Sequence, residues 1–243
     1  MRLVRLMTSI VVLLVSVFMT TFPAVAAQDA ASPVAIDAPN DLGLPGIESQ
    51  LLGIGTSGEP ASGMPRMRLE RISLPAGSIL PMHTAGGPEL LVVESGTPGI
   101  TDAFGFTGVI APNGTFFEAG AQYTLGNPGA DDASALRLSL AEGTDADLAS
   151  PTATVATVTL LIDSPLDDPR LSEPTLTIAK LTWHPGTDSP VLEHDAAVGL
   201  VVLDGILFAK SPSGFEGQLA PNMPVVFPAN TPLEARAGDD GPA

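Results

Sequence analysis

The residues that could do chemistry are few, and the clearest are His83 and Glu89, which lie between Gly77 and Gly96. Imidazole and carboxylate groups are both ligands that divalent first-row metals accept. The chain has three histidines and no cysteine, which excludes disulfides, thiolate metal sites and cysteine nucleophiles. It also has no nucleophile motif and no glycine loop that would cradle a phosphate.

These residues belong to a unit that occurs twice in the chain. Glycines and prolines recur at one constant offset, and one residue is then inserted, so that Phe117 matches Phe227. The matching pairs include Gly77 with Gly186, Pro81 with Pro190, Gly96 with Gly205, Gly105 with Gly214, and the Ala-Pro-Asn segment 111–113 with 220–222. Chance does not hold one register through so many turn residues, so we interpret the chain as an internal duplication.

Each repeat is predicted to be all-β. The 25 glycines and 24 prolines indicate many short elements joined by turns. Leucines at every second position of 136–140 alternate with Arg137 and Ser139, which is the pattern of a half-buried strand. The apolar runs 90–93 and 198–203 suit strands that are buried on both sides.

The first repeat resembles the cupin family at that family's first motif, G-x5-H-x-H followed by E-x6-G. Gly77, His83, Glu89 and Gly96 keep every spacing, and Ala85 stands where the second histidine would be. In the second motif, Tyr123 occupies the histidine position and Asn127 matches the final asparagine.

The second repeat keeps the motif spacing, but fewer of its ligand positions carry residues that can bind a metal. Leu192 and Val198 replace the first histidine and the glutamate, and Leu233 replaces the histidine of the second motif. Only His194 retains its type. The resemblance covers about residues 47–243, and it implies two tandem jelly-roll barrels of the cupin type.

Active cupins hold manganese, iron or another divalent metal with three histidines and a glutamate, so the resemblance implies one candidate metal site, formed by His83, Glu89 and Tyr123 in the first barrel. We favour the alternative in which His83 and Glu89 hydrogen-bond inside a barrel that holds no metal, because catalytic sites commonly use three firm ligands. Ala85, Leu192, His194, Val198 and Leu233 are expected to line the two pockets. Those of the second barrel suit an apolar ligand or a filled core.

The chain is predicted to divide into a signal helix at 1–26, a flexible linker at 27–46, a first barrel at 47–153 and a second barrel at 154–243. Arginines at the start, an apolar run and an Ala-Val-Ala cleavage site are typical of an export signal. The counterpart of the strand at 136–140 falls beyond residue 243, so the second barrel is expected to lack its last strand. Pro33 to Ile36 is a candidate to fill the gap.

The formal charge of −17 argues against nucleic acid and anionic membranes as partners. We expect a protein that is secreted or otherwise extracytoplasmic, with an uncleaved N-terminal membrane anchor as the alternative. Its function is expected to be that of a non-catalytic module, structural or binding a small molecule, without a cofactor. The alternative is a metal-dependent enzyme of the dioxygenase or decarboxylase type, active in the first barrel. A homodimer is a further expectation.

Overall fold

Every regular element in the described part of this computed structural model is a β-strand. The structure describes residues 10–19, 47–57, 65–84, 87–105, 107–119, 122–141, 156–166, 174–189, 191–192, 194 and 196–238. No helix that could cross a membrane is found among these residues. The chain forms two compact units, one built mainly from Leu52–Thr177 and the other from Ile178–Ala243 together with Ala38–Leu51 and Met1–Ser16.

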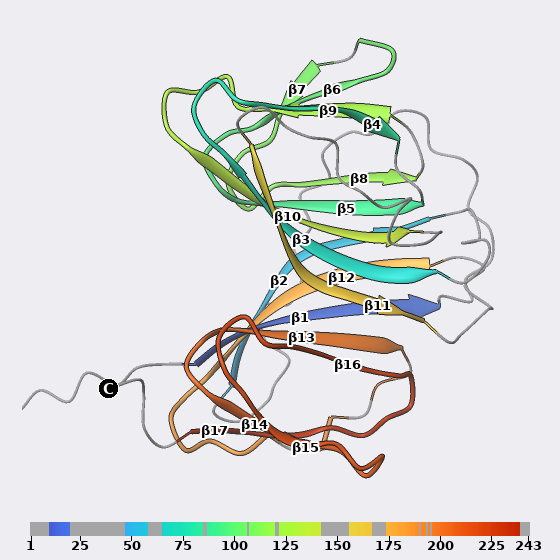
Figure 1. Cartoon of the computed structure of the whole chain (residues 1–243), viewed down its shortest axis with the longest axis vertical. Coiled ribbons are helices and arrows are strands. Elements are labelled where there is room, and N and C mark those ends of the chain that lie inside the picture. The colour runs from blue at the N-terminus through green and yellow to red at the C-terminus, as the bar shows by residue number, and fades with distance from the viewer. Residues whose placement is uncertain are drawn as a thin grey trace, which may run out of the picture. The chain divides into compact units, whose positions relative to one another are not determined.

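The first unit contains two sheets that form the first barrel (Figure 1). The larger sheet has the order β11-β3-β10-β5-β8, and its strands are β3 (Arg66–Leu74), β5 (Pro88–Ser95), β8 (Thr115–Ala119), β10 (Ala133–Ala141) and β11 (Thr157–Pro165). The smaller sheet has the order β4-β9-β6-β7, and its strands are β4 (Ile79–Thr84), β6 (Gly99–Asp102), β7 (Thr107–Val109) and β9 (Gln122–Gly126).

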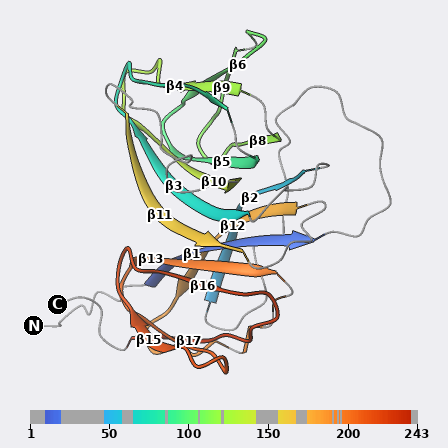
Figure 2. The same ribbon diagram turned by 45° about the vertical axis from the view of Figure 1, so that its right-hand side comes forward.

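Two further sheets, formed mainly by residues of the second unit, make up the second barrel (Figure 2). Its larger sheet has the order β16-β13-β1-β12-β2, and its strands are β1 (Ile10–Met19), β2 (Ile47–Thr56), β12 (Pro174–Trp183), β13 (Ala197–Asp204) and β16 (Pro224–Phe227). Its smaller sheet has the order β15-β14-β17, and its strands are β14 (Leu207–Lys210), β15 (Glu216–Leu219) and β17 (Glu234–Ala237). The prediction of an all-β fold with two tandem barrels is confirmed.

Equivalent turn glycines of the two repeats have nearly the same backbone φ angle. Gly77 and Gly186 have φ of 73° and 72°, and Gly96 and Gly205 have φ of 72° and 79°. Side chains other than glycine rarely adopt this left-handed region. The same rare conformation therefore recurs at equivalent positions of the two repeats, which explains why these glycines carry the repeat signal in the sequence.

The structure differs from the sequence prediction at the N-terminus. Residues 1–26 are predicted as a signal helix, whereas Ile10–Met19 form strand β1. The rest of the predicted signal lies outside the described residues, as does the candidate filler Pro33 to Ile36. A run rich in valine and isoleucine suits a strand. The predicted domain boundaries stay predictions, although β11, which follows the boundary at residue 153, pairs with β3 of the first barrel.

Candidate functional site

The first barrel brings two of the three predicted metal-site residues into contact. Tyr123 lies on β9 and Glu89 lies near the start of β5, and the phenol donates a 2.8 Å hydrogen bond to Oε2 of Glu89. Both side chains are buried, with exposed fractions of 1% and 7%. His83 pairs with Tyr123 in the register of β4 and β9, so the backbone places it at the same point of the barrel. The side chain of His83 and all of Ala85 lie outside the described part.

The surroundings of Tyr123 keep its phenol protonated. Burial raises the pKa of Tyr123 well above its ordinary value, and the negative charge of Glu89 raises it further. The nearby charge of Arg137 acts in the opposite direction and does not reverse this shift. Since a phenol must lose its proton to bind a metal as phenolate, the observed environment disfavours Tyr123 as a ligand.

A buried ion pair lies next to this hydrogen bond. The guanidinium of Arg137, on β10, donates from Nε to Oε2 of Glu70 at 2.8 Å, and Arg68 Nη2 contacts the other carboxylate oxygen of Glu70 at 2.9 Å. Arg137 and Glu70 are directly opposite each other in the register of β10 and β3. Both residues are buried, with exposed fractions of 5% and 1%.

The positive charge of Arg137 interacts with the carboxylates of both Glu70 and Glu89. Its burial alone would lower the pKa of the guanidinium, but the negative charges of Glu89 and Glu70 outweigh this effect and raise the pKa. The two arginines and two glutamates therefore balance in charge, and a positive guanidinium lies near the place where the family resemblance implies a metal ion.

Sequence reasoning missed Arg137 and Glu70. It interpreted the alternation at 136–140 as a half-buried strand, which is wrong, because all five residues are buried. The polar face of β10 points to the barrel interior, where Ala133 and Ala135 belong to the apolar core. The sequence does contain a signal for this ion pair, which is the charged Arg137 within an otherwise apolar strand. Buried charged residues are unusual unless they are paired.

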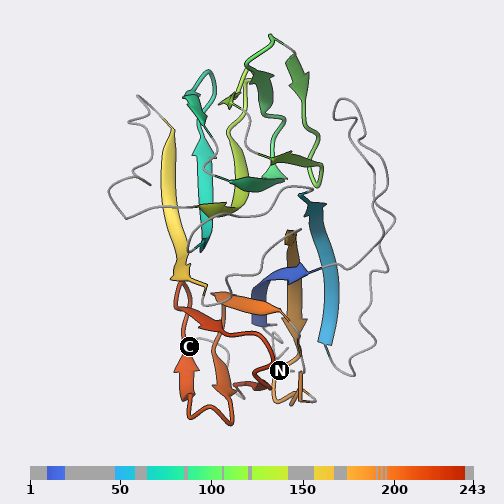
Figure 3. The same ribbon diagram turned by 90° about the vertical axis from the view of Figure 1, so that its right-hand side faces the viewer.

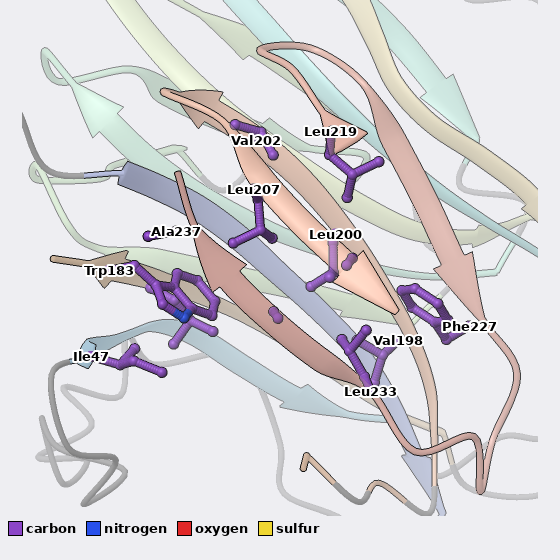
Figure 4. Close-up of a cluster of buried hydrophobic side chains, with 13 residues drawn as sticks. Ile47, Trp183, Val198, Leu200, Val202, Leu207, Leu219, Phe227, Leu233 and Ala237 are labelled. Carbon is purple, nitrogen blue, oxygen red and sulfur yellow. The ribbon is translucent and has the colours of Figure 1, made fainter. Parts of the chain in front are cut away.

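The corresponding positions of the second barrel carry apolar side chains. Leu192 and Leu233 exchange two backbone hydrogen bonds of 2.8 and 3.0 Å, which repeats the pairing of His83 with Tyr123. Val198 and Leu233 are buried in a cluster with Trp183 and other side chains, as Figure 4 shows, and Leu192 packs against it. These predicted pocket residues therefore lie together in a packed core.

His194 lies at the edge of that region and is partly exposed. Its Nδ1 is 2.6 Å from the carbonyl oxygen of Ala196, and its buried Nε2 has no hydrogen-bond partner among the described residues. Across the described ranges, no group of three or more histidine, aspartate or glutamate side chains is arranged to hold a metal ion.

An open groove of about 650 Å³ lies elsewhere on the second barrel, over the outward side chains of β14, β15 and β17. Phe208, Lys210, Gln218 and Arg236 are among its lining residues. None of the predicted pocket residues lines it. Binding of a small molecule in the predicted barrel pockets stays a prediction.

No family model matches the sequence. A search of curated proteins also found no match. The chain is similar to several solved structures. One is AerE from Microcystis aeruginosa, at 12% identity and a TM-score of 0.47, with 86% of this chain and 91% of that chain covered. Another is a putative glyoxylate-induced protein from Pseudomonas aeruginosa, at 14% identity and a TM-score of 0.45, with 90% and 91% covered.

The seed protein procruciferin, an 11S globulin from Brassica napus, is similar at 10% identity and a TM-score of 0.39, with 82% of each chain covered. At such identities the likeness concerns the fold and says nothing about activity. The function of the chain must therefore be argued from its own residues.

Proposed function

We propose that this chain is a non-catalytic cupin-type module in which the first barrel's ligand positions have become a buried polar core. One observation carries the proposal: Tyr123, at the position of a metal-binding histidine, donates a hydrogen bond to Glu89, the carboxylate of the same motif. The donor and the acceptor of this bond are both removed from solvent. Two of the three groups that would have to bind an ion, Tyr123 and Glu89, are thus hydrogen-bonded to each other.

Arg137 supports the same proposal. A carboxylate buried without a counter-charge is costly, and the guanidinium supplies positive charge close to both Glu89 and Glu70. The second barrel supports it as well, because Leu192, Val198 and Leu233 offer no metal ligand. We propose further that the protein acts outside the cytoplasm, on the basis of the export-signal pattern at 1–26.

The phenol of Tyr123 provides a direct test, because the chain contains one tyrosine. The native full-length protein is titrated with base while the near-ultraviolet absorbance of phenolate is recorded. We expect no phenolate at neutral pH and none near the ordinary pKa of about 10. Phenolate should appear only at higher pH, together with unfolding. The denatured chain is the control and should titrate near pH 10.

The sign of the pH effect on stability follows from the same shift. The pKa of Tyr123 is higher in the folded than in the unfolded chain, so its contribution is complete below about pH 10 and is lost as pH rises toward the folded value. A Tyr123→Phe variant should lack this loss between the two pKa values. Its free energy of unfolding should therefore depend less on pH in that alkaline range.

The enzyme alternative predicts different results. A divalent metal held by His83, Glu89 and Tyr123 would co-purify in about one-to-one ratio, which elemental analysis detects. Adding manganese, iron or zinc would also produce phenolate absorbance at neutral pH in the wild type and not in Tyr123→Phe. Either result would overturn the non-catalytic proposal.

A further inference from the structure

The N-terminal strand β1 occupies a defined place in the second barrel. The larger sheet of the first barrel has the order β8-β5-β10-β3-β11, and that of the second has β16-β13-β1-β12-β2. The pairs β5 with β13, β3 with β12, β8 with β16 and β2 with β11 are equivalent strands of the two repeats, as their positions along the chain show. Strand β1 therefore stands where the first barrel has β10.

The second repeat does not supply this strand from the residues that the structure describes. Its last described strand is β17, which corresponds to β9 of the first repeat. In the first repeat, β10 follows β9 and pairs with both β3 and β5. The equivalent place between β12 and β13 is instead taken by a segment from the other end of the chain (Figure 3).

The neighbours of β1 need a partner there. Strand β13 is buried along five consecutive residues, 198–202, and most of β12 is buried as well. Backbone N–H and C=O groups on buried strands are expensive to leave unpaired. The composition of Ile10–Met19 fits the place, because it contains no charge, no glycine and no proline and is rich in valine, isoleucine and leucine. Such runs are typical of strands covered on both faces.

We infer that the place between β12 and β13 is a strand-acceptor site, and that its ligand in the full-length chain is the apolar segment Ile10–Met19. The segment that looks like an export signal is thus also the strand that completes the second barrel. Cleavage after residue 26 would break its covalent link, and only its sheet neighbours would then hold it. The inference is independent of the proposal about the first barrel's polar core.

A cleavage experiment on the full chain tests this inference. A specific protease site is inserted within residues 27–46, the folded protein is cut, and the products are separated by size under native conditions. We expect the N-terminal fragment to remain bound to the rest of the chain and to leave only in denaturant. Its release with no change in hydrogen exchange of β12 and β13 would overturn the inference.

A proline substitution provides a second, independent test. Proline has no N–H and is not tolerated in a central strand, so Leu14→Pro should release β1 from the sheet. We expect amide hydrogen exchange in β12 and β13 to accelerate by about tenfold or more. Amides of β3, β5 and β10 in the first barrel are the internal reference and should not change. Ala35→Pro, in the predicted linker, is the matched control.

Unchanged exchange in β12 and β13 of Leu14→Pro would contradict the inference. If that variant did not fold at all while Ala35→Pro did, the first test would still decide, because it begins from the folded wild-type sequence with an insertion in the linker. Adding a synthetic peptide of residues 8–21 to the cut and separated protein should restore slow exchange in these two strands. Failure of the peptide to do so would count against a strand-acceptor site.

Discussion

Tyr123 and Leu233 hold the same position in the two barrels, and the difference between them explains what each barrel has kept. In the first, a phenol is surrounded by Glu89 and the charge of Arg137, and every charge in the group has an opposite partner nearby. In the second, Leu233 belongs to a continuous apolar cluster. Each barrel interior is stabilised in its own way. Paired polar groups fill the first, whereas dispersion and the hydrophobic effect stabilise the second.

The ion pair between Arg137 and Glu70 predicts a large effect of removing one partner. Arg137→Met leaves Glu70 and Glu89 buried with less positive charge, so we expect the free energy of unfolding to fall by about 3–5 kcal/mol. Arg71→Met is the matched control, because Arg71 pairs with Glu94 at 2.9 Å but both side chains are partly exposed. Its loss should be about 0–1 kcal/mol. Urea unfolding followed by circular dichroism measures both, and equal losses would show that burial of the pair is unimportant.

At the scale of the elements, the tight turns were predictable and the strand partners were not. Gly77, Gly96 and their counterparts mark turns because the backbone there requires positive φ, and this requirement is visible in sequence. The buried face of β10 was not recognised, because alternation alone does not say whether the second face meets solvent or a barrel interior. Strand β1 was missed because its apolar run fits an export signal and a buried strand equally well.

Substitution of two glycines in the first barrel separates the backbone cost of positive φ from the cost of a steric clash. Both Gly77 and Gly96 have positive φ, but a Cβ on Gly77 would meet no heavy atom within 4 Å, whereas one on Gly96 would lie 2.6 Å from Cβ of Ala133. Gly77→Ala should cost about 1–2 kcal/mol from the backbone alone. Gly96→Ala should cost clearly more, because the start of β10 must also move. Denaturant midpoints of the two variants test this, and equal costs would contradict the close approach.

At the scale of the whole molecule, the arginines described in the first barrel take part in ion pairs. Arg66 contacts Asp163 at 2.8 Å, Arg71 contacts Glu94, and Arg68 and Arg137 share Glu70. The chain carries 27 acidic and only 10 basic residues, so the remaining charge is predominantly negative. Repulsion among these carboxylates opposes the compact state.

This excess charge predicts that salt stabilises the protein at neutral pH. Raising the ionic strength from about 0.01 M to 0.1 M shortens the Debye length from about 30 Å to 10 Å, which screens repulsion between distant surface carboxylates but affects the buried pair of Arg137 and Glu70 little. The thermal midpoint at pH 7 should therefore rise with added sodium chloride. The control is the same measurement near pH 4.2, the isoelectric point, where the net charge vanishes and the salt effect should shrink. An equal rise at both pH values would mean that salt acts through burial of apolar surface and not through charge repulsion.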